Sequence, residues 1–106
     1  MLKYTIAIDA MGGDNAPKSI IDGLAISSIR NPSSNYIIFG DEKQIGPLIK
    51  DSKQLKKVSK VIHVEDWIRG DEKASKSIRR SKTTSMGLSI ASVANGEADA
   101  VVSSGN

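Results

Sequence analysis

The sequence contains no cysteine, and this absence removes several classes of function at once. Disulfide-stapled folds, thiolate zinc sites and catalysis by a cysteine nucleophile are all excluded. Aromatic residues make up 4% of the chain and Trp67 is its one tryptophan, so platforms for stacking single-stranded nucleic acid are scarce. No apolar run approaches the roughly 20 residues of a membrane span. The opening residues are too short in their apolar part for a secretory signal, and a cytoplasmic location is expected.

The charge of the chain is mildly basic, with 15 Lys and Arg residues against 12 Asp and Glu residues and a net charge of +3. Many of the lysines lie between Lys43 and Lys82. A bias of this size is typical of a solvated lysine-rich surface, and it also suits an acidic partner or an anionic substrate. The length of 106 residues is that of one small domain with a single core.

Apolar segments rich in β-branched residues alternate along the chain with segments of helical spacing. Strands are predicted at residues 3–9, 36–39, 58–64 and 98–103. Helices are predicted from Pro17 to about residue 29 with Asn15 as a cap, after a cap at Asp41, and after a cap at Thr84 or Ser85. A further short helix is predicted around residues 75–80. Strands that alternate with helices predict a parallel sheet with right-handed crossovers, which is an α/β fold.

The last predicted helix has Gly96 as its C-terminal residue and carries four apolar residues, Met86, Ile90, Val93 and Ala94. In a parallel sheet, ligands bind beyond the carboxyl ends of the strands, so the segment after each strand is a candidate binding loop. These segments are residues 10–17, 40–42, 65–73 and 103–106. Two of the four contain glycine beside polar residues that suit binding, namely the first and the last.

The first of these loops holds Gly12 and Gly13 between Asp9 and Asp14, just before an expected helix start. Free backbone N–H groups and the helix dipole at such a place favour an anion, for example a phosphate or a carboxylate. A tight turn without any ligand fits the same residues. The two aspartates suit acid–base chemistry or metal binding, and they equally suit helix capping.

Cations and hydroxyls are concentrated in residues 71–86, and this combination suits a phosphoryl group. The members are Lys73, Ser75, Lys76, Ser77, Arg79, Arg80, Ser81, Lys82 and Ser85. A solvated basic loop is the alternative. His63 is the only histidine and lies inside the third predicted strand, which favours a structural role over that of a catalytic base. No GxSxG elbow accompanies it, so serine catalysis has little support.

Three segments together resemble the beginning of the bacterial phosphate acyltransferase family. They are IAIDAMGGDNAP, the stretch ASKSIRRSKTTSM after Asp71 and Lys73, and GEADAVVSSGN, in this order. The resemblance implies a Rossmann-like three-layer fold with a mainly parallel sheet, of which residues 1–106 are the amino-terminal part. It also implies transfer of a fatty acyl group from acyl carrier protein to inorganic phosphate, which gives acyl phosphate for phospholipid synthesis. No cofactor and no metal are implied.

The same resemblance implies roles for particular residues. Catalytic roles fall to Asp9, Lys73, Arg79 and Asn106. Binding of phosphate or substrate falls to Gly12, Gly13, Asp14, Ser85, Ser103 and Gly105. The full-length relatives are implied to be homodimers, peripheral to the membrane through a partner, a membrane glycerol-3-phosphate acyltransferase that takes up acyl phosphate.

Two rival readings differ in class from this enzyme. One is a truncated, catalytically inactive remnant that acts at most as an anion-binding domain. The other is a nucleic-acid-binding module built on residues 73–82, which the shortage of aromatic residues disfavours. The resemblance therefore implies an enzyme, and the low aromatic content disfavours nucleic acid as a partner.

Overall fold

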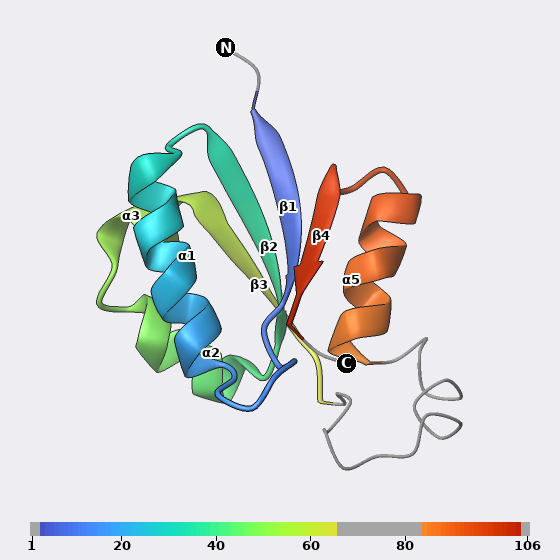
Figure 1. The fold of residues 1–106 in the computed structure, drawn as a ribbon, viewed down its shortest axis with the longest axis horizontal. Helices are drawn as coiled ribbons and strands as arrows, with labels where there is room; N and C mark the ends of the chain where they lie inside the picture. Colours follow the sequence, from blue (N-terminus) through green and yellow to red (C-terminus); the bar gives the residue numbers. More distant parts are fainter. Residues whose placement is uncertain (1–2, 66–83, 105–106) are drawn as a thin grey trace.

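A computed structural model describes residues 3–65 and 84–104 of the chain. Four strands form one sheet in the order β3-β2-β1-β4, and all neighbouring strands are parallel (Figure 1). The strands are β1 (Tyr4–Asp9), β2 (Ser34–Gly40), β3 (Ser59–His63) and β4 (Ala100–Ser103). The prediction of an α/β fold with a mainly parallel sheet is therefore confirmed.

Helices cover both faces of this sheet. The helices α1 (Lys18–Arg30), α2 (Glu42–Ile49) and α3 (Lys53–Val58) lie on one face, and α5 (Ser85–Ala94) lies on the other (Figure 1). This arrangement gives three layers, as a Rossmann-like fold requires. Among the helices that the structure describes, none is long and apolar enough to cross a bilayer.

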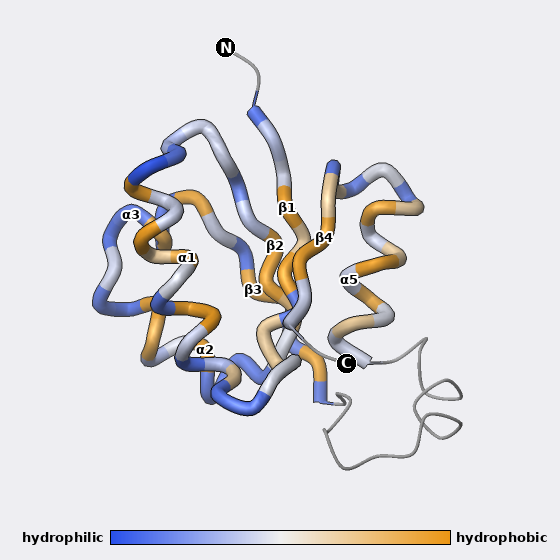
Figure 2. Tube along the Cα trace, viewed as in Figure 1, coloured by the Kyte–Doolittle hydropathy of each residue, from blue (hydrophilic) through white to orange (hydrophobic). Residues whose placement is uncertain are grey.

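The hydrophobic core is divided by the sheet into two clusters, and Figure 2 shows hydrophobic residues concentrated along the central strands. Ile8 and Ile38 pack with α1 and α2 residues on one face, while Ala7 and Phe39 pack with Val64 on the other. Ala7 and Ile8 are both almost completely buried, although they point to opposite faces. This confirms the burial of β1 on both faces that its continuous apolar run predicts.

Helix α3 was not predicted, and the predicted third strand begins one residue too early, because Val58 belongs to this helix. The helix has six residues and one fully buried side chain, Leu55, so no helical period can be recognised in the sequence. Its start is marked by Ser52, whose side chain accepts a hydrogen bond from the Leu55 backbone N–H at 3.3 Å. A serine cap therefore supports a helix too short to have its own periodicity.

The prediction that Asn15 caps the first helix is wrong. Pro17 occupies the N-cap position of α1 and no side chain caps it, whereas Asn15 offers its backbone carbonyl to the Ser19 N–H at 3.1 Å. The predicted caps Asp41 and Thr84 are confirmed: Asp41 accepts from the Lys43 N–H and Thr84 accepts from the Gly87 N–H.

Helix α5 buries a face of serines rather than its large apolar residues. Ser85, Ser89 and Ser92 are buried, while Ile90 is 52% exposed. The hydroxyls of Ser89 and Ser92 donate to carbonyls of the preceding helical turn, each at 2.6 Å. Because their polar groups are satisfied within the helix, these small side chains allow α5 to pack against β1, β2 and β4.

Candidate functional site

The carboxylate of Asp9, at the carboxyl end of β1, is the centre of the candidate site. It is 2% exposed. Its Oδ1 accepts hydrogen bonds from the Met11 backbone N–H at 3.1 Å and from the Ser85 hydroxyl at 2.6 Å. Its Oδ2 accepts from the Ser103 hydroxyl at 2.7 Å. One side chain thus connects the loop after β1, the first residue of α5 and the last residue of β4.

Sheet register explains why these residues meet. Asp9 is paired with Ser103 across the β1–β4 ladder, and paired residues on neighbouring parallel strands point to the same face. That face is covered by α5, whose first residue is Ser85. The helix dipole favours negative charge near a helix N-terminus, which suits a carboxylate at this point.

The glycine loop is tied to the end of β4 by a second contact. The Ser104 hydroxyl donates to the Gly12 carbonyl at 2.8 Å. Gly13 has φ +93°, a conformation that side chains disfavour, and a Cβ at this position would lie 2.8 Å from Ser104 Oγ. Gly13 and Asp14 are exposed, whereas Gly12 is buried. The loop is therefore held closely against Ser104 while part of it faces solvent.

The predicted start of the first helix, at Pro17, is one residue too early. Residues 14–17 form turns, and α1 begins only at Lys18. The dipole of α1 consequently does not end at Gly13. The helix N-terminus that borders the candidate site is that of α5, through Ser85.

Four predicted site residues, Lys73, Arg79, Gly105 and Asn106, lie outside the described residues, as does the short helix predicted around residues 75–80. Of the others, the structure brings together Asp9, Ser85 and Ser103 by direct hydrogen bonds. Gly12 joins this group through Ser104. Gly13 and Asp14 follow in the same loop.

Sequence reasoning missed the part played by Met11. Its side chain is 5% exposed and belongs to the core cluster beneath α1. A Cβ at Gly40 would lie 3.0 Å from the Met11 Cγ and Sδ atoms, so a side chain at position 40 would crowd Met11. An apolar residue directly before two glycines is the only signal in the sequence, and it indicates a loop anchored in the core.

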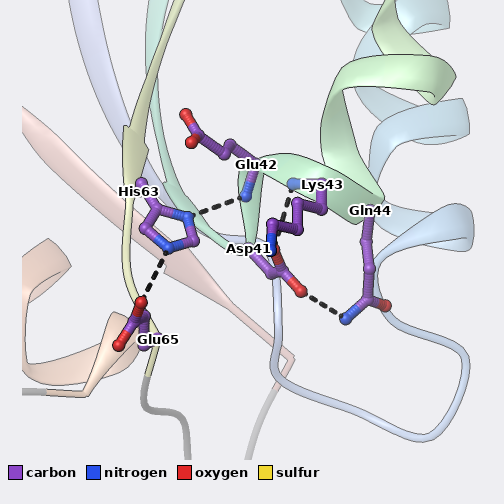
Figure 3. Close-up of polar contacts among 6 residues, drawn as sticks. All are labelled: Asp41, Glu42, Lys43, Gln44, His63 and Glu65. Atoms are coloured by element: carbon purple, nitrogen blue, oxygen red, sulfur yellow. Dashed lines mark hydrogen bonds and ion pairs between the residues drawn. The ribbon is translucent and has the colours of Figure 1, made fainter.

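A second polar cluster lies where β2 and β3 end, and Figure 3 shows its side chains. His63 Nδ1 accepts from the Glu42 backbone N–H at 3.1 Å, and its Nε2 lies 3.7 Å from a Glu65 carboxylate oxygen. An open cavity of about 380 Å³ is lined by Asp41, Glu42, Lys43, His63 and Glu65. His63 thus supports the first turn of α2, which agrees with the structural role inferred for it.

The Asp41 cap in this cluster makes stability depend on pH. Hydrogen bonds from the Gln44 side chain and then from the Lys43 backbone N–H hold the pKa of Asp41 below its ordinary value. A carboxyl group with a lowered folded-state pKa stabilises the fold above its unfolded pKa of about 3.9, and this contribution is lost as the pH falls through the folded pKa.

We therefore expect Asp41→Asn to unfold at lower urea concentration than the parent chain at pH 7, and the difference to disappear as the pH falls from about 4 through the lowered pKa. Asparagine keeps a capping oxygen and removes the charge, so the variant isolates the titrating part. Urea denaturation at a series of pH values measures this, with Asp51→Asn as a control. A difference that stays constant down to acidic pH would contradict the expectation.

Within residues 3–65 and 84–104, no three His, Cys, Asp or Glu side chains are grouped closely enough to hold a metal ion. The described residues of the candidate site present backbone N–H groups, hydroxyls and carboxylates. Such donors bind anions well when they converge on one point.

The fold and the contact between Asp9 and Ser103 define an α/β domain, whose candidate site lies at the carboxyl ends of the adjacent parallel strands β1 and β4. The sequence profile of the family described as fatty acid synthesis protein matches residues 4–106, and the chain belongs to this family.

Relatives within curated proteins bear the name phosphate acyltransferase. The one from Rhodospirillum rubrum is 42% identical over 101 residues, which are 95% of this chain and 29% of the relative. The one from Parvibaculum lavamentivorans is 43% identical over 103 residues, or 96% of this chain and 28% of the relative. The Enterococcus faecalis protein is 43% identical over 101 residues, which are 95% of this chain and 29% of the relative. The chain thus spans less than a third of the length of these relatives.

Proposed function

We propose that this chain is the amino-terminal part of a phosphate acyltransferase that moves a fatty acyl group from acyl carrier protein to inorganic phosphate. The product is acyl phosphate, used for phospholipid synthesis. The proposal is supported by the names of relatives that match about 95% of the chain. The structural observation that supports it most is that hydrogen bonds of Asp9 and Gly12 connect the glycine loop to Ser103 and Ser104 at the end of β4.

The reaction needs few chemical groups from the protein. A phosphate oxygen attacks the thioester carbonyl, a carbon–oxygen bond forms, and the carbon–sulfur bond breaks with release of the carrier's thiolate, which then takes up a proton. The protein has to hold a phosphate anion close to the carbonyl and stabilise the oxyanion that develops on it. Backbone N–H groups of a glycine-rich turn and nearby hydroxyls suit both tasks.

Within this function we assign phosphate and substrate binding to Gly12, Gly13, Asp14, Ser85, Ser103 and Gly105. The catalytic groups are Asp9, Lys73, Arg79 and Asn106, with the two cations neutralising phosphate charge. The whole protein acts as a cytoplasmic homodimer, and it delivers acyl phosphate to a membrane glycerol-3-phosphate acyltransferase. No cofactor, metal or nucleic acid takes part.

The simplest test of this function compares the turnover of acyl carrier protein thioester by two chains. One is the 106-residue chain, and the other is a joined chain, in which these residues replace the matching part of the Enterococcus faecalis relative. We expect the joined chain to release free thiol from acyl carrier protein thioester only when phosphate is present, with acyl phosphate as the product. The unaltered relative is the control for assay and assembly. Thiol release that does not depend on phosphate would contradict the proposal.

The second candidate function is that of an anion-binding domain without turnover. It is favoured for the chain by itself because the match covers 28–30% of the relatives. Turnover by the joined chain and none by the 106-residue chain would support this reading of the isolated chain. Turnover by both would remove it.

A further inference from the structure

We propose that Asp9 is a positioning residue, whose carboxylate fixes the glycine loop, the start of α5 and the end of β4 relative to one another. In this role Asp9 takes no part in proton transfer. Its contribution to catalysis in the proposed function is therefore limited to positioning the other groups. The inference rests on the proposed function, because it concerns the same site.

The first support is the occupation of both carboxylate oxygens. Among the described residues, Oδ1 accepts from the Met11 N–H and the Ser85 hydroxyl, and Oδ2 accepts from the Ser103 hydroxyl. The two hydroxyl contacts are short, at 2.6 and 2.7 Å. These donors come from three separate segments of the chain, so their relative position depends on one side chain.

The second support is burial. Asp9 is 2% exposed, lies at the end of β1 and is covered by α5. A general acid or base has to come within hydrogen-bond distance of the proton that it transfers, directly or through one water. The side chain instead faces protein donors, and the exposed residues of the described site are Gly13, Asp14, Ser103 and Ser104.

The third support is the path from Asp9 to the exposed part of the loop. Asp9 holds Ser103, and the next residue, Ser104, donates to the Gly12 carbonyl at 2.8 Å. On the other side Asp9 holds the N–H of Met11, directly before Gly12. Asp9 thus influences the position of Gly12 and Gly13 from two sides, through Met11 and through Ser103 and Ser104. Loss of the carboxylate therefore displaces the glycine loop even though Asp9 does not contact it beyond Met11.

The test compares Asp9→Asn with Asp9→Ala in the joined chain. Asparagine keeps an oxygen for Met11 and Ser85, and its NH₂ group can donate to a reoriented Ser103 hydroxyl, so the geometry is largely retained. We expect Asp9→Asn to keep kcat/KM within about 10-fold of the parent with an unchanged pH profile, because proton transfer by a positioned side chain contributes about 10²–10⁴-fold and is not needed from Asp9. Asp9→Ala is expected to lose about 100-fold, since small misplacements of reacting groups cost this much.

Asp22→Asn is the matched control. Asp22 is exposed and pairs with Lys18 on the surface of α1, so the same chemical change there leaves activity unchanged. The positioning role is overturned if Asp9→Asn loses as much activity as Asp9→Ala and one limb of the pH profile disappears with it. That result would identify Asp9 as the acid or base.

A readout without turnover separates this inference from the proposed function. In the 106-residue chain, backbone amide resonances report on the loop directly. Ser103→Ala should shift the Gly13 amide through Ser104, and Ser85→Ala should shift the Met11 amide, whose hydrogen bond shares Oδ1 with Ser85. Both variants leave Asp9 in place, so they remain informative if Asp9→Ala does not fold.

These shifts decide the positioning role even if the joined chain shows no phosphate-dependent turnover. In that case the proposed function fails, and shifts at Gly13 and Met11 still support Asp9 as the link between the segments. Amides of Gly13 and Met11 that remain unmoved in Ser103→Ala and Ser85→Ala, as they should in Asp22→Asn, would overturn the inference.

Discussion

Replacement of Gly13 by alanine is expected to remove phosphate binding at the glycine loop and to reduce turnover of the joined chain by about 100-fold, the cost of a misplaced reacting group. Two causes combine. The φ of +93° is unfavourable for any residue with a Cβ, at a cost of about 1–3 kcal/mol. The new Cβ would also lie 2.8 Å from Ser104 Oγ, which has to turn away and give up its hydrogen bond to Gly12.

Gly96→Ala provides the matched control for the first cause. Gly96 has φ +80°, and nothing lies within 4 Å of a Cβ built there, so this variant carries similar backbone strain away from the site. We expect Gly96→Ala to lower the free energy of unfolding without changing phosphate-induced shifts of the amide resonances. Adding Ser104→Ala to Gly13→Ala should recover part of the binding by relieving the contact. Equal phosphate binding in the parent and Gly13→Ala would contradict the account of this loop.

Met11→Ala is expected to cause the largest loss of stability, about 2–5 kcal/mol, because truncation of a buried side chain leaves a cavity in the core. Met11 is 5% exposed and packs with Ile8, Ile21 and Ile45 in the cluster beneath α1. It is also the residue whose N–H is bound by Asp9, so its displacement frees the loop at its first turn. Urea denaturation gives the stability, and hydrogen exchange at the Gly12 and Gly13 amides gives the loosening of the loop.

Met11→Leu separates volume from chemistry at this position. A volume-conserving exchange in a core costs less than about 1.5 kcal/mol, so this variant should keep both the stability and the exchange rates close to those of the parent. A Met11→Ala variant with unchanged stability would show that the loop is not anchored in the core.

The sheet could be predicted because its strands carry strong signals. The run Ile6, Ala7 and Ile8 is apolar on both faces, and β2 contains a comparable run. Each run is continuous in the sequence and can be recognised without the structure. Parallel pairing of the strands follows from their alternation with helices. Helix α3 has one buried residue and no period, so it could not be recognised. The buried serine face of α5 could not be predicted either, because serines rarely mark a core face unless their hydroxyls bond within the helix.

The site could be predicted only in outline. The predicted strand ends and the glycines indicated that the first and last candidate loops lie at one edge of the sheet. The contact of Asp9 with Ser103 does bring the ends of β1 and β4 together. The roles of Asp9 and Ser104 depend on contacts between segments 76 to 94 residues apart in the chain, which a local pattern does not carry. The role of Met11 depends on its packing in the core cluster with residues of α1 and α2. The cap predicted at Asn15 was wrong for a related reason, since the turns at residues 14–17 have no distinct signal.

The most direct measurement is a phosphate titration of the 106-residue chain, followed through backbone amide resonances with sulfate and chloride as controls. If the glycine loop and residues 103–104 at the end of β4 form one anion site, phosphate should shift the amides of Gly12, Gly13 and Ser104 together, with a common dissociation constant and more strongly than either control ion. A well-dispersed spectrum in which phosphate moves none of these amides would contradict a phosphate site at this edge of the sheet.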